Sequence, residues 1–132
     1  MSERGSVSVL TAAVLFLAAS LCLASVDLLR ATEARARAQA AADAAALAAA
    51  RELAIPTGQD PSEAAREYAE RNGATLRSCS CPIGATEAVV DVEVPLDLVF
   101  VGADRTVEAR ARAVVEGAGG APGGTGPIWG GG

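Results

Sequence analysis

The two cysteines of Cys79-Ser80-Cys81 are the side chains of this sequence with the widest choice of chemistry. In a strand, residues two positions apart point to the same face of the sheet, so the two thiols can meet. They can pair with each other, pair between molecules or stay free, and two thiols supply only half of a tetrahedral zinc site. The preferred prediction is a disulfide between Cys79 and Cys81, which requires the strand to bend near Pro82 and Gly84.

The remaining composition offers little material for catalysis. The chain has no histidine and no lysine, which removes histidine-based triads, imidazole metal ligands, the lysine of phosphate-binding loops and Schiff-base chemistry. Asp91 and Glu93 alternate with valines, as the solvated face of a strand does. We predict no enzymatic activity, no catalytic, cofactor-binding or metal-binding residues, no cofactor and no small-molecule substrate. The net charge of −5 and the lack of a basic patch argue against nucleic-acid binding.

An apolar run without a charged residue extends from Val7 to Val26. Its length of about 20 residues corresponds to a helix of about 30 Å, the thickness of the hydrocarbon core of a bilayer. The preferred prediction is a transmembrane helix over residues 7–29, preceded by a cytoplasmic N-terminus over residues 1–6. A secretory signal cleaved near Ser25 is the main alternative. A buried helix of a soluble protein fits poorly, because the rest of the chain is too short to cover it.

An alanine-rich segment over residues 30–55 follows the apolar run without a helix breaker. Because alanine has the highest helix propensity, the sequence predicts one continuous helix that ends before Pro56. Small residues at a four-residue spacing share one face of a helix and let another backbone approach closely. This predicted packing face consists of Ala38, Ala42, Ala46 and Ala50. A spacer that packs on nothing is the alternative.

Residues 60–116 predict a small α+β head, which begins with a second helix. Asp60 suits the cap position, Pro61 suits the first helical position, and Glu63 is placed to reach back to the cap amide. Asn72-Gly73 predicts the end of this helix in a left-handed conformation.

Three segments of the head alternate apolar and polar side chains, as half-buried antiparallel strands do. They cover residues 74–81, 86–100 and 105–116. Pro95 predicts a bulge, a strand end or an edge position. We expect the short helix or the lower part of the long helix to cover the apolar face of this small sheet. The glycine-rich tail over residues 117–132 is predicted to be disordered.

Four segments together resemble the actinobacterial TadE/TadG-like proteins of tight-adherence (Flp-type) pilus systems. In chain order they are Glu3-Arg4-Gly5-Ser6, AQAAADAAALAAAREL, DPSEAAREYAERNG and strands that end in EARARAVV. The resemblance covers most of the chain before the glycine-rich tail. It implies a pseudopilin-like or minor pilus component that acts structurally, with the N-terminus in the cytoplasm and the strands outside.

The resemblance also implies a candidate processing site between Gly5 and Ser6. Precursors of pilins and TadE-type pseudopilins carry a glutamate five residues after the cleaved glycine, whereas this chain has Leu10 there. TadG-like proteins share the alanine segment without clear processing. Cleavage after Gly5 and retention of the whole N-terminus therefore both stay open.

Two functions of different class follow. The first is a single-pass, membrane-anchored component of a Tad-type pilus assembly or secretion system. Its partners would be the membrane and other Tad/Flp proteins, or a second copy of itself through the N-terminal helix. The second is a secreted, soluble envelope-binding module released by signal peptidase.

The topology of the anchor rests on two opposing indications. Arg30, Arg35 and Arg37 follow the apolar run and only Arg4 precedes it, so the positive-inside rule would place the head in the cytoplasm. The resemblance implies the reverse. We adopt a cell-membrane protein with a cytoplasmic N-terminus and an extracytoplasmic head.

Overall fold

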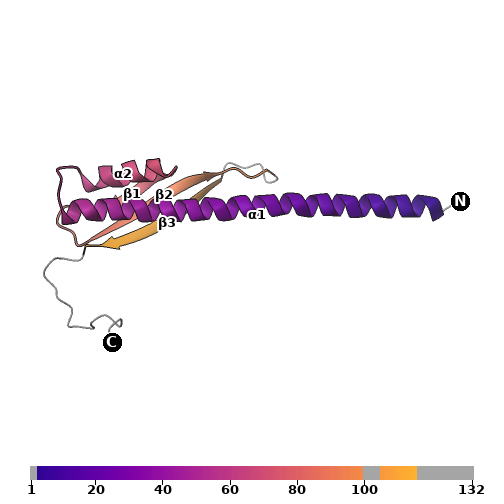
Figure 1. Cartoon of the computed structure of the whole chain (residues 1–132), viewed down its shortest axis with the longest axis horizontal. Helices are drawn as coiled ribbons and strands as arrows, with labels where there is room; N and C mark the ends of the chain where they lie inside the picture. The colour runs from indigo at the N-terminus through magenta and orange to yellow at the C-terminus, as the bar shows by residue number, and fades with distance from the viewer. Residues whose placement is uncertain (1–2, 100–104, 116–132) are drawn as a thin grey trace, which may run out of the picture.

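The computed structural model describes residues 3–99 and 105–115, which form two helices beside one three-stranded sheet (Figure 1). The elements in chain order are α1 (Glu3–Ala54), α2 (Pro61–Arg71), β1 (Thr75–Ser80), β2 (Glu87–Leu96) and β3 (Arg105–Val114). The predicted α+β fold is confirmed, with one long helix, one short helix and antiparallel strands in the order β1-β2-β3. The predicted connection over residues 101–104 and the predicted tail over residues 117–132 lie outside the described residues.

Helix α1 is unbroken over 52 residues. Between Ser6 and Ile55 its sequence contains no glycine or proline and is rich in alanine, so no residue opposes the helical conformation strongly. In the apolar half, the hydroxyls of Thr11, Ser20 and Ser25 donate to carbonyl oxygens four residues earlier at 2.8–2.9 Å. These bonds satisfy the hydroxyl groups without water, as a hydrocarbon environment requires.

The end of α1 is held by a side chain of its own last turn. The backbone N–H of Thr57 donates to a carboxylate oxygen of Glu52 at 3.0 Å, and the Thr57 hydroxyl donates to the same carboxylate. Pro56 and the positive φ of Gly58 (+100°) then turn the chain back toward α2.

Helix α2 begins and ends as its sequence predicts, with one difference. Asp60 Oδ1 accepts a hydrogen bond from the backbone N–H of Ser62 at 2.8 Å, and Pro61 is the first helical residue. The Glu63 carboxylate does not reach back to the cap. It accepts a hydrogen bond from the Arg66 guanidinium one turn later, because a charged donor forms a stronger hydrogen bond with a carboxylate than the backbone amide of the cap does. Gly73 ends the helix with φ +72° and donates its N–H to the Glu70 carbonyl at 3.0 Å.

The strands pair through two ladders of different regularity. Strands β2 and β3 pair without interruption from Glu87↔Val114 to Leu96↔Arg105. The ladder of β1 and β2 contains one register shift, between Leu76 and Ser78. This bulge lets β1 present Leu76 and Cys79, three positions apart, toward the same layer of the core.

Pro95 lies one residue before the end of β2, where it pairs with Thr106 of β3. The pairing of β1 with β2 begins at Thr75↔Glu93, two residues before Pro95 in β2. Pro95 therefore has no partner in β1. The predicted strand-end position of this proline is therefore confirmed, whereas the bulge of the sheet lies in β1. A residue without an N–H is tolerated there because one side of the strand is locally an edge.

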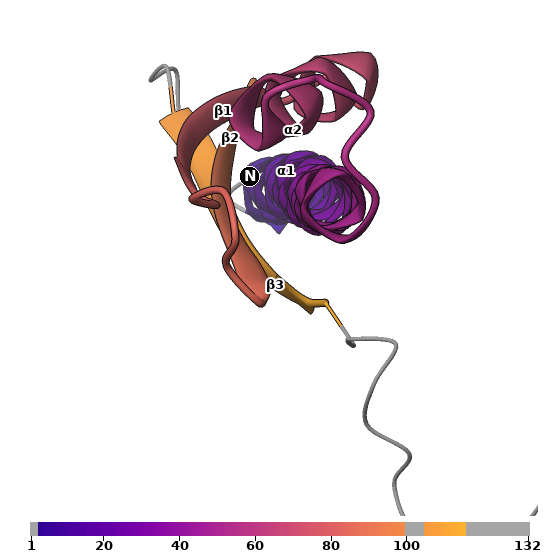
Figure 2. The same cartoon turned by 90° about the vertical axis from the view of Figure 1, so that its left-hand side faces the viewer.

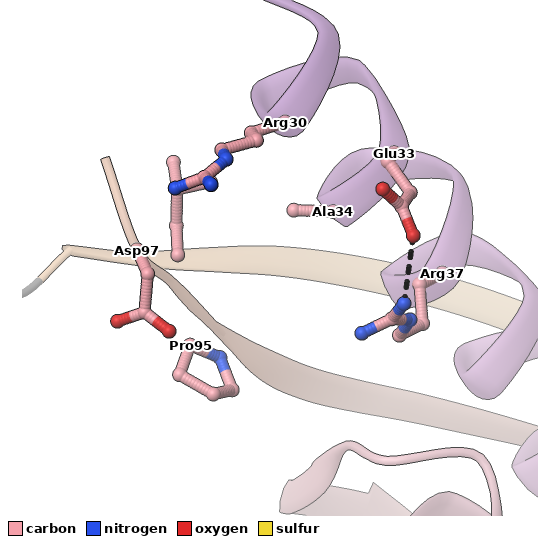
Figure 3. Close-up of a pocket in the computed structure, with 7 residues that line it drawn as sticks. Arg30, Glu33, Ala34, Arg37, Pro95 and Asp97 are labelled. Carbon is pink, nitrogen blue, oxygen red and sulfur yellow. Dashed lines mark hydrogen bonds and ion pairs between the residues drawn. The ribbon is translucent and has the colours of Figure 1, made fainter. Parts of the chain in front are cut away.

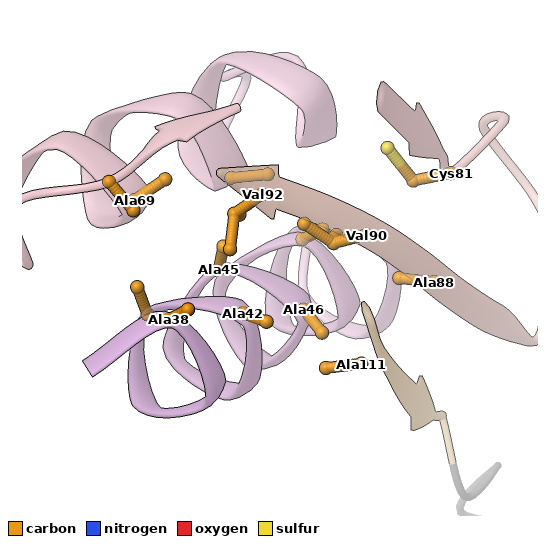
Figure 4. Close-up of a cluster of buried hydrophobic side chains, with 14 of the residues drawn as sticks. Ala38, Ala42, Ala45, Ala46, Ala69, Cys81, Ala88, Val90, Val92 and Ala111 are labelled. Atoms are coloured by element: carbon orange, nitrogen blue, oxygen red, sulfur yellow. The ribbon is translucent and has the colours of Figure 1, made fainter. Parts of the chain in front are cut away.

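Both helices pack on the same face of the sheet, as Figure 2 shows in a view along α1. Helix α1 lies across β2 and β3, and α2 lies beside α1 over β1. Val90, Val92 and Val94 of β2 are the largest fully buried side chains and point into this layer. The helical side of the core is almost entirely alanine (Figure 4): Ala38, Ala41, Ala42, Ala45, Ala46, Ala49 and Ala50 of α1, with Ala65 and Ala69 of α2.

Candidate functional site

The predicted packing face on α1 lies inside the molecule. Ala38, Ala42, Ala46 and Ala50 are exposed by at most 5% and belong to one core cluster with the valines of β2 (Figure 4). Their methyl groups let the helix backbone approach the sheet closely, which is the physical property that the sequence predicts for this face. The partner of this face is therefore the sheet of the same chain, which agrees with the expectation that the lower part of the long helix covers the sheet. Association between molecules has to use other surfaces.

A different face of the same helix remains accessible along the head. We call this surface the outer stripe, and it consists of Arg35, Ala36, Gln39, Ala40, Asp43 and Leu47, all exposed. The Gln39 side-chain amide donates to Asp43 Oδ1 at 3.0 Å, so the polar part of the stripe is locally organised. Leu47 is 67% exposed and is the one large apolar side chain of the stripe. The four-residue spacing of small residues in the sequence selects the alanines and gives no signal for Leu47.

The apolar half of α1 is uncovered. Exposed fractions of its large side chains lie between 41% at Leu23 and 77% at Phe16. By length and composition this is the one helix of the described residues long and apolar enough to cross a membrane. Gly5 and Ser6, the candidate processing site, lie in the first turns of the helix, and Leu10 is 66% exposed one turn further on. Cleavage after Gly5 stays a prediction.

The boundary between the two halves of α1 carries a contact with the sheet. The backbone N–H of Val99, just beyond β2, donates to Asp27 Oδ1 at 2.9 Å. Next to this contact lies a polar hollow of about 310 Å³, with Arg30 of α1 on one side and Asp97, after β2, on the other (Figure 3). The Arg37 guanidinium in its wall is paired with Glu33 at 2.8 Å. Positive and negative groups balance in this hollow, so it has no strong preference for an anion.

The two cysteines of the head lie in the core rather than in an open site. A disulfide joins Cys79 and Cys81 at the end of β1. Cys81 is 8% exposed, Cys79 is half-buried against the same cluster, and the disulfide leaves neither of them as a free thiol. The third cysteine, Cys22, is a free thiol on the exposed apolar half of α1.

Three carboxylates of β2 lie on the solvent-facing side of the sheet and are paired with arginines: Glu87, Asp91 and Glu93. Asp91 accepts hydrogen bonds from Arg110 and from Ser78, which hold the pKa of its carboxyl group below the usual range. Glu93 Oε2 lies 3.4 Å from Arg77 Nη1 and forms an ion pair with it. An acid with a lowered pKa and tied oxygens is a poor general acid or base. In residues 3–99 and 105–115 no group of three metal-ligating side chains comes together.

One comparison with known proteins gives a match and two do not. Residues 5–52 match the family model described as "Putative Flp pilus-assembly TadE/G-like". No curated protein and no solved structure matches the chain. The matched residues are almost the whole of α1, both its uncovered apolar half and the alanine-rich half that forms the core of the head. The long helix of this protein is therefore similar to the TadE/G-like pilus-assembly proteins, while α2 and the sheet lie outside the matched residues.

Proposed function

We propose that this protein is a single-pass, membrane-anchored structural component of a Tad-type pilus assembly or secretion system, resembling the pseudopilins. The observation that carries the proposal is the double use of the family-matched helix. The first half of α1 is apolar and uncovered, and its second half is the spine of the head. The chemistry of the described residues supports a structural role, because Asp91, Glu93 and Glu87 of the sheet are paired with arginines and Cys79 and Cys81 are joined in a disulfide.

The helix couples the head rigidly to the membrane. At 1.5 Å per residue, the 52 residues of α1 extend over about 78 Å without a glycine or proline hinge after Gly5. Its alanines pack directly on the valines of β2. A force or displacement applied to the membrane-embedded part therefore reaches the head through one stiff element. A subunit that is pushed or anchored by neighbours in an assembly needs this property.

The surfaces left for partners are the uncovered apolar half of α1 and the outer stripe. They follow one another along the same helix, so a neighbouring helix in the assembly can contact both. We propose that other Tad components, or a second copy of this chain, pack here. The alanines Ala38, Ala42, Ala46 and Ala50 serve the head instead.

We place the N-terminus in the cytoplasm and the head outside. The disulfide between Cys79 and Cys81 supports this orientation, because such bonds persist in oxidising compartments. The arginine-rich start of the head half opposes it under the positive-inside rule. Of these arginines, Arg37 is paired with Glu33 in the structure.

Two measurements on cells that express the full chain test the proposal. The protein should stay in the membrane pellet after a carbonate wash, and a reporter that is active only outside the cytoplasm should be active when fused after Gly117. A reporter active only in the cytoplasm would reverse the orientation. Release of the chain by the carbonate wash would show that α1 does not anchor the protein in the membrane.

The alternative, a soluble module released by signal peptidase, has one structural point in its favour. The core of the head begins at Ala34, so a cut near Ser25 would leave every core residue in place. The mass of the mature chain separates the two functions. A chain that begins near Ser25 would identify the released module.

A further inference from the structure

We propose that the head is seated on the lipid surface, with Leu98 and Val99 in contact with the membrane interface beside α1. This inference rests on the proposed membrane anchor and adds a second contact between protein and lipid. The expected ligand is the interfacial region of the bilayer, where acyl chains meet head groups.

Val99 lies at the level where the apolar run of α1 ends. Its backbone N–H donates to Asp27 Oδ1 at 2.9 Å, although the two residues are 72 positions apart in sequence. Asp27 directly follows the apolar run that ends at Val26. A run of about 20 residues fills the hydrocarbon thickness, so its last residue marks the place where the helix leaves the lipid. Val99 is held at that place.

Two segments that are distant in sequence change from apolar to polar residues near this same level. On α1, Asp27 ends the uncharged run, the apolar Leu28 and Leu29 after it are 66% and 68% exposed, and Arg30 is the next charged residue. After β2, the order along the chain is reversed, from polar to apolar. The exposed Asp97 lies on the side of Arg30 (Figure 3), and the apolar Leu98 and Val99 follow it toward Asp27.

Connections between strands that lie in water are usually rich in glycine, asparagine, aspartate, serine and proline. Here the residues at the level of the span are apolar instead, and Val99 is 54% exposed. A common boundary for two segments that are distant in sequence is what a planar lipid surface imposes. Packing inside the protein does not explain the exposure of Val99, Leu28 and Leu29, although Leu98 is half-buried.

The polar groups at this boundary are arranged for an interface. The Asp27 carboxylate accepts from the backbone of Val99, and ionisable groups close to lipid are typically satisfied in this way. The Arg30 side chain is long enough to place its guanidinium at the level of the lipid phosphates while its stem lies along apolar surface. The head is thus placed directly on the membrane and is not displayed at the end of a helical stalk.

Tryptophan fluorescence provides the test, because Trp129 is the single tryptophan of the chain. Two full-length variants carry one tryptophan each: V99W/W129F at the proposed contact, and I83W/W129F as the matched control. Ile83 is 87% exposed in the connection between β1 and β2 and lines a hollow with Leu53, near the other end of the head half of α1. Each variant is reconstituted in phosphatidylcholine vesicles and in the same vesicles containing dibrominated phosphatidylcholine, whose bromine atoms quench only nearby indoles.

We expect brominated lipid to lower the emission of V99W/W129F by at least about twofold, because interfacial apolar groups sink about 5–10 Å into the boundary, and to leave I83W/W129F unchanged. Unquenched emission from V99W/W129F in vesicles that retain the protein after carbonate would overturn the lipid contact and leave the anchor intact. A blue-shifted but unquenched indole would also overturn it, since protein would then cover residue 99. Loss of both variants from the vesicles would instead refute the anchor itself. Val99 lies outside the core, so the substitution leaves the packing of the head undisturbed, and far-ultraviolet circular dichroism checks this.

Discussion

Asp91 of β2 and Arg110 of β3 are directly opposite each other on the solvent-facing side of the sheet and share two hydrogen bonds. Arg110 Nε donates to Oδ1 at 2.6 Å, and Nη2 donates to Oδ2 at 2.9 Å. The Ser78 hydroxyl of β1 donates to Oδ2 at 2.8 Å, so one carboxylate connects all three strands. These bonds favour the register in which the valines on either side of Asp91 face the helices.

The Asp91 network predicts a defined dependence of stability on pH. Because its hydrogen bonds lower the pKa of Asp91 in the folded protein, the stabilisation is present above the unfolded pKa of about 3.9 and is lost as pH falls through the folded value. The contribution should stay below about 1 kcal/mol, since the Arg110 side chain is largely exposed. Thermal unfolding of the full chain in detergent between pH 7 and pH 2, compared with Asp91→Asn, measures it. Parallel curves for the two proteins would show that the network adds nothing.

Enlarging the buried alanines should damage the fold of the monomer. Ala42→Leu and Ala46→Leu retain helix propensity but insert side chains where the helix backbone meets the sheet, at an expected cost of about 1–3 kcal/mol each. Ala40→Leu, on the outer stripe, is the matched control and should change the free energy of unfolding by less than about 0.5 kcal/mol. Chemical denaturation of the three variants decides the matter. Equal stabilities would mean that the head does not pack on this face.

Leu47 tests whether the outer stripe is a surface for assembly. Leu47→Glu places a charge on an exposed position, so the stability of the fold should stay within about 0.5 kcal/mol of the parent. Crosslinking of the chain into larger species in the membrane should fall. Ile83→Glu, the same change at another exposed apolar residue, should leave crosslinking unaltered. Unchanged crosslinking in Leu47→Glu would exclude the stripe from assembly.

The three cysteines predict a simple count of thiols. The unreduced, unfolded chain should react with thiol reagent at one site, Cys22, and the reduced chain at three. Three reactive thiols before reduction would rule out the bridge. Replacing both Cys79 and Cys81 by alanine should cost less than about 2 kcal/mol from chain entropy, because the closed loop is very short.

The N-terminus of the mature chain is the remaining prediction. We expect the apolar half of α1 to be retained, with the chain beginning either at Ser6 or at its original N-terminus. Intact-mass measurement of protein from the membrane fraction distinguishes the two. A Gly5→Leu variant should block the shorter form if cleavage occurs between Gly5 and Ser6. A mature chain that begins near Val26 would contradict retention of the span.

Local physical chemistry made most of the secondary structure predictable from the sequence. Uninterrupted alanine-rich sequence after an apolar run determines one long helix, since propensity and the absence of breakers act residue by residue. Asp60, Pro61 and Gly73 determine the ends of α2 through their own hydrogen bonds and backbone angles. Alternation of valine with charged residues determines β2. The same local features carry the resemblance of residues 5–52 to the pilus-assembly family.

Tertiary structure alone decided what each surface meets. A face of small residues accepts another helix as readily as a sheet, so the sequence left open whether Ala42 would lie against the protein's own valines or against a second chain. The contact between Asp27 and Val99 depends on the length of α1, the register of β2 and the bulge in β1 together, and none of these is visible in a short window. The exposure of the outer stripe likewise depends on which face of α1 the sheet covers. Which face of a helix remains exposed is known only once the sheet has covered the other, because burial is a property of the packed whole.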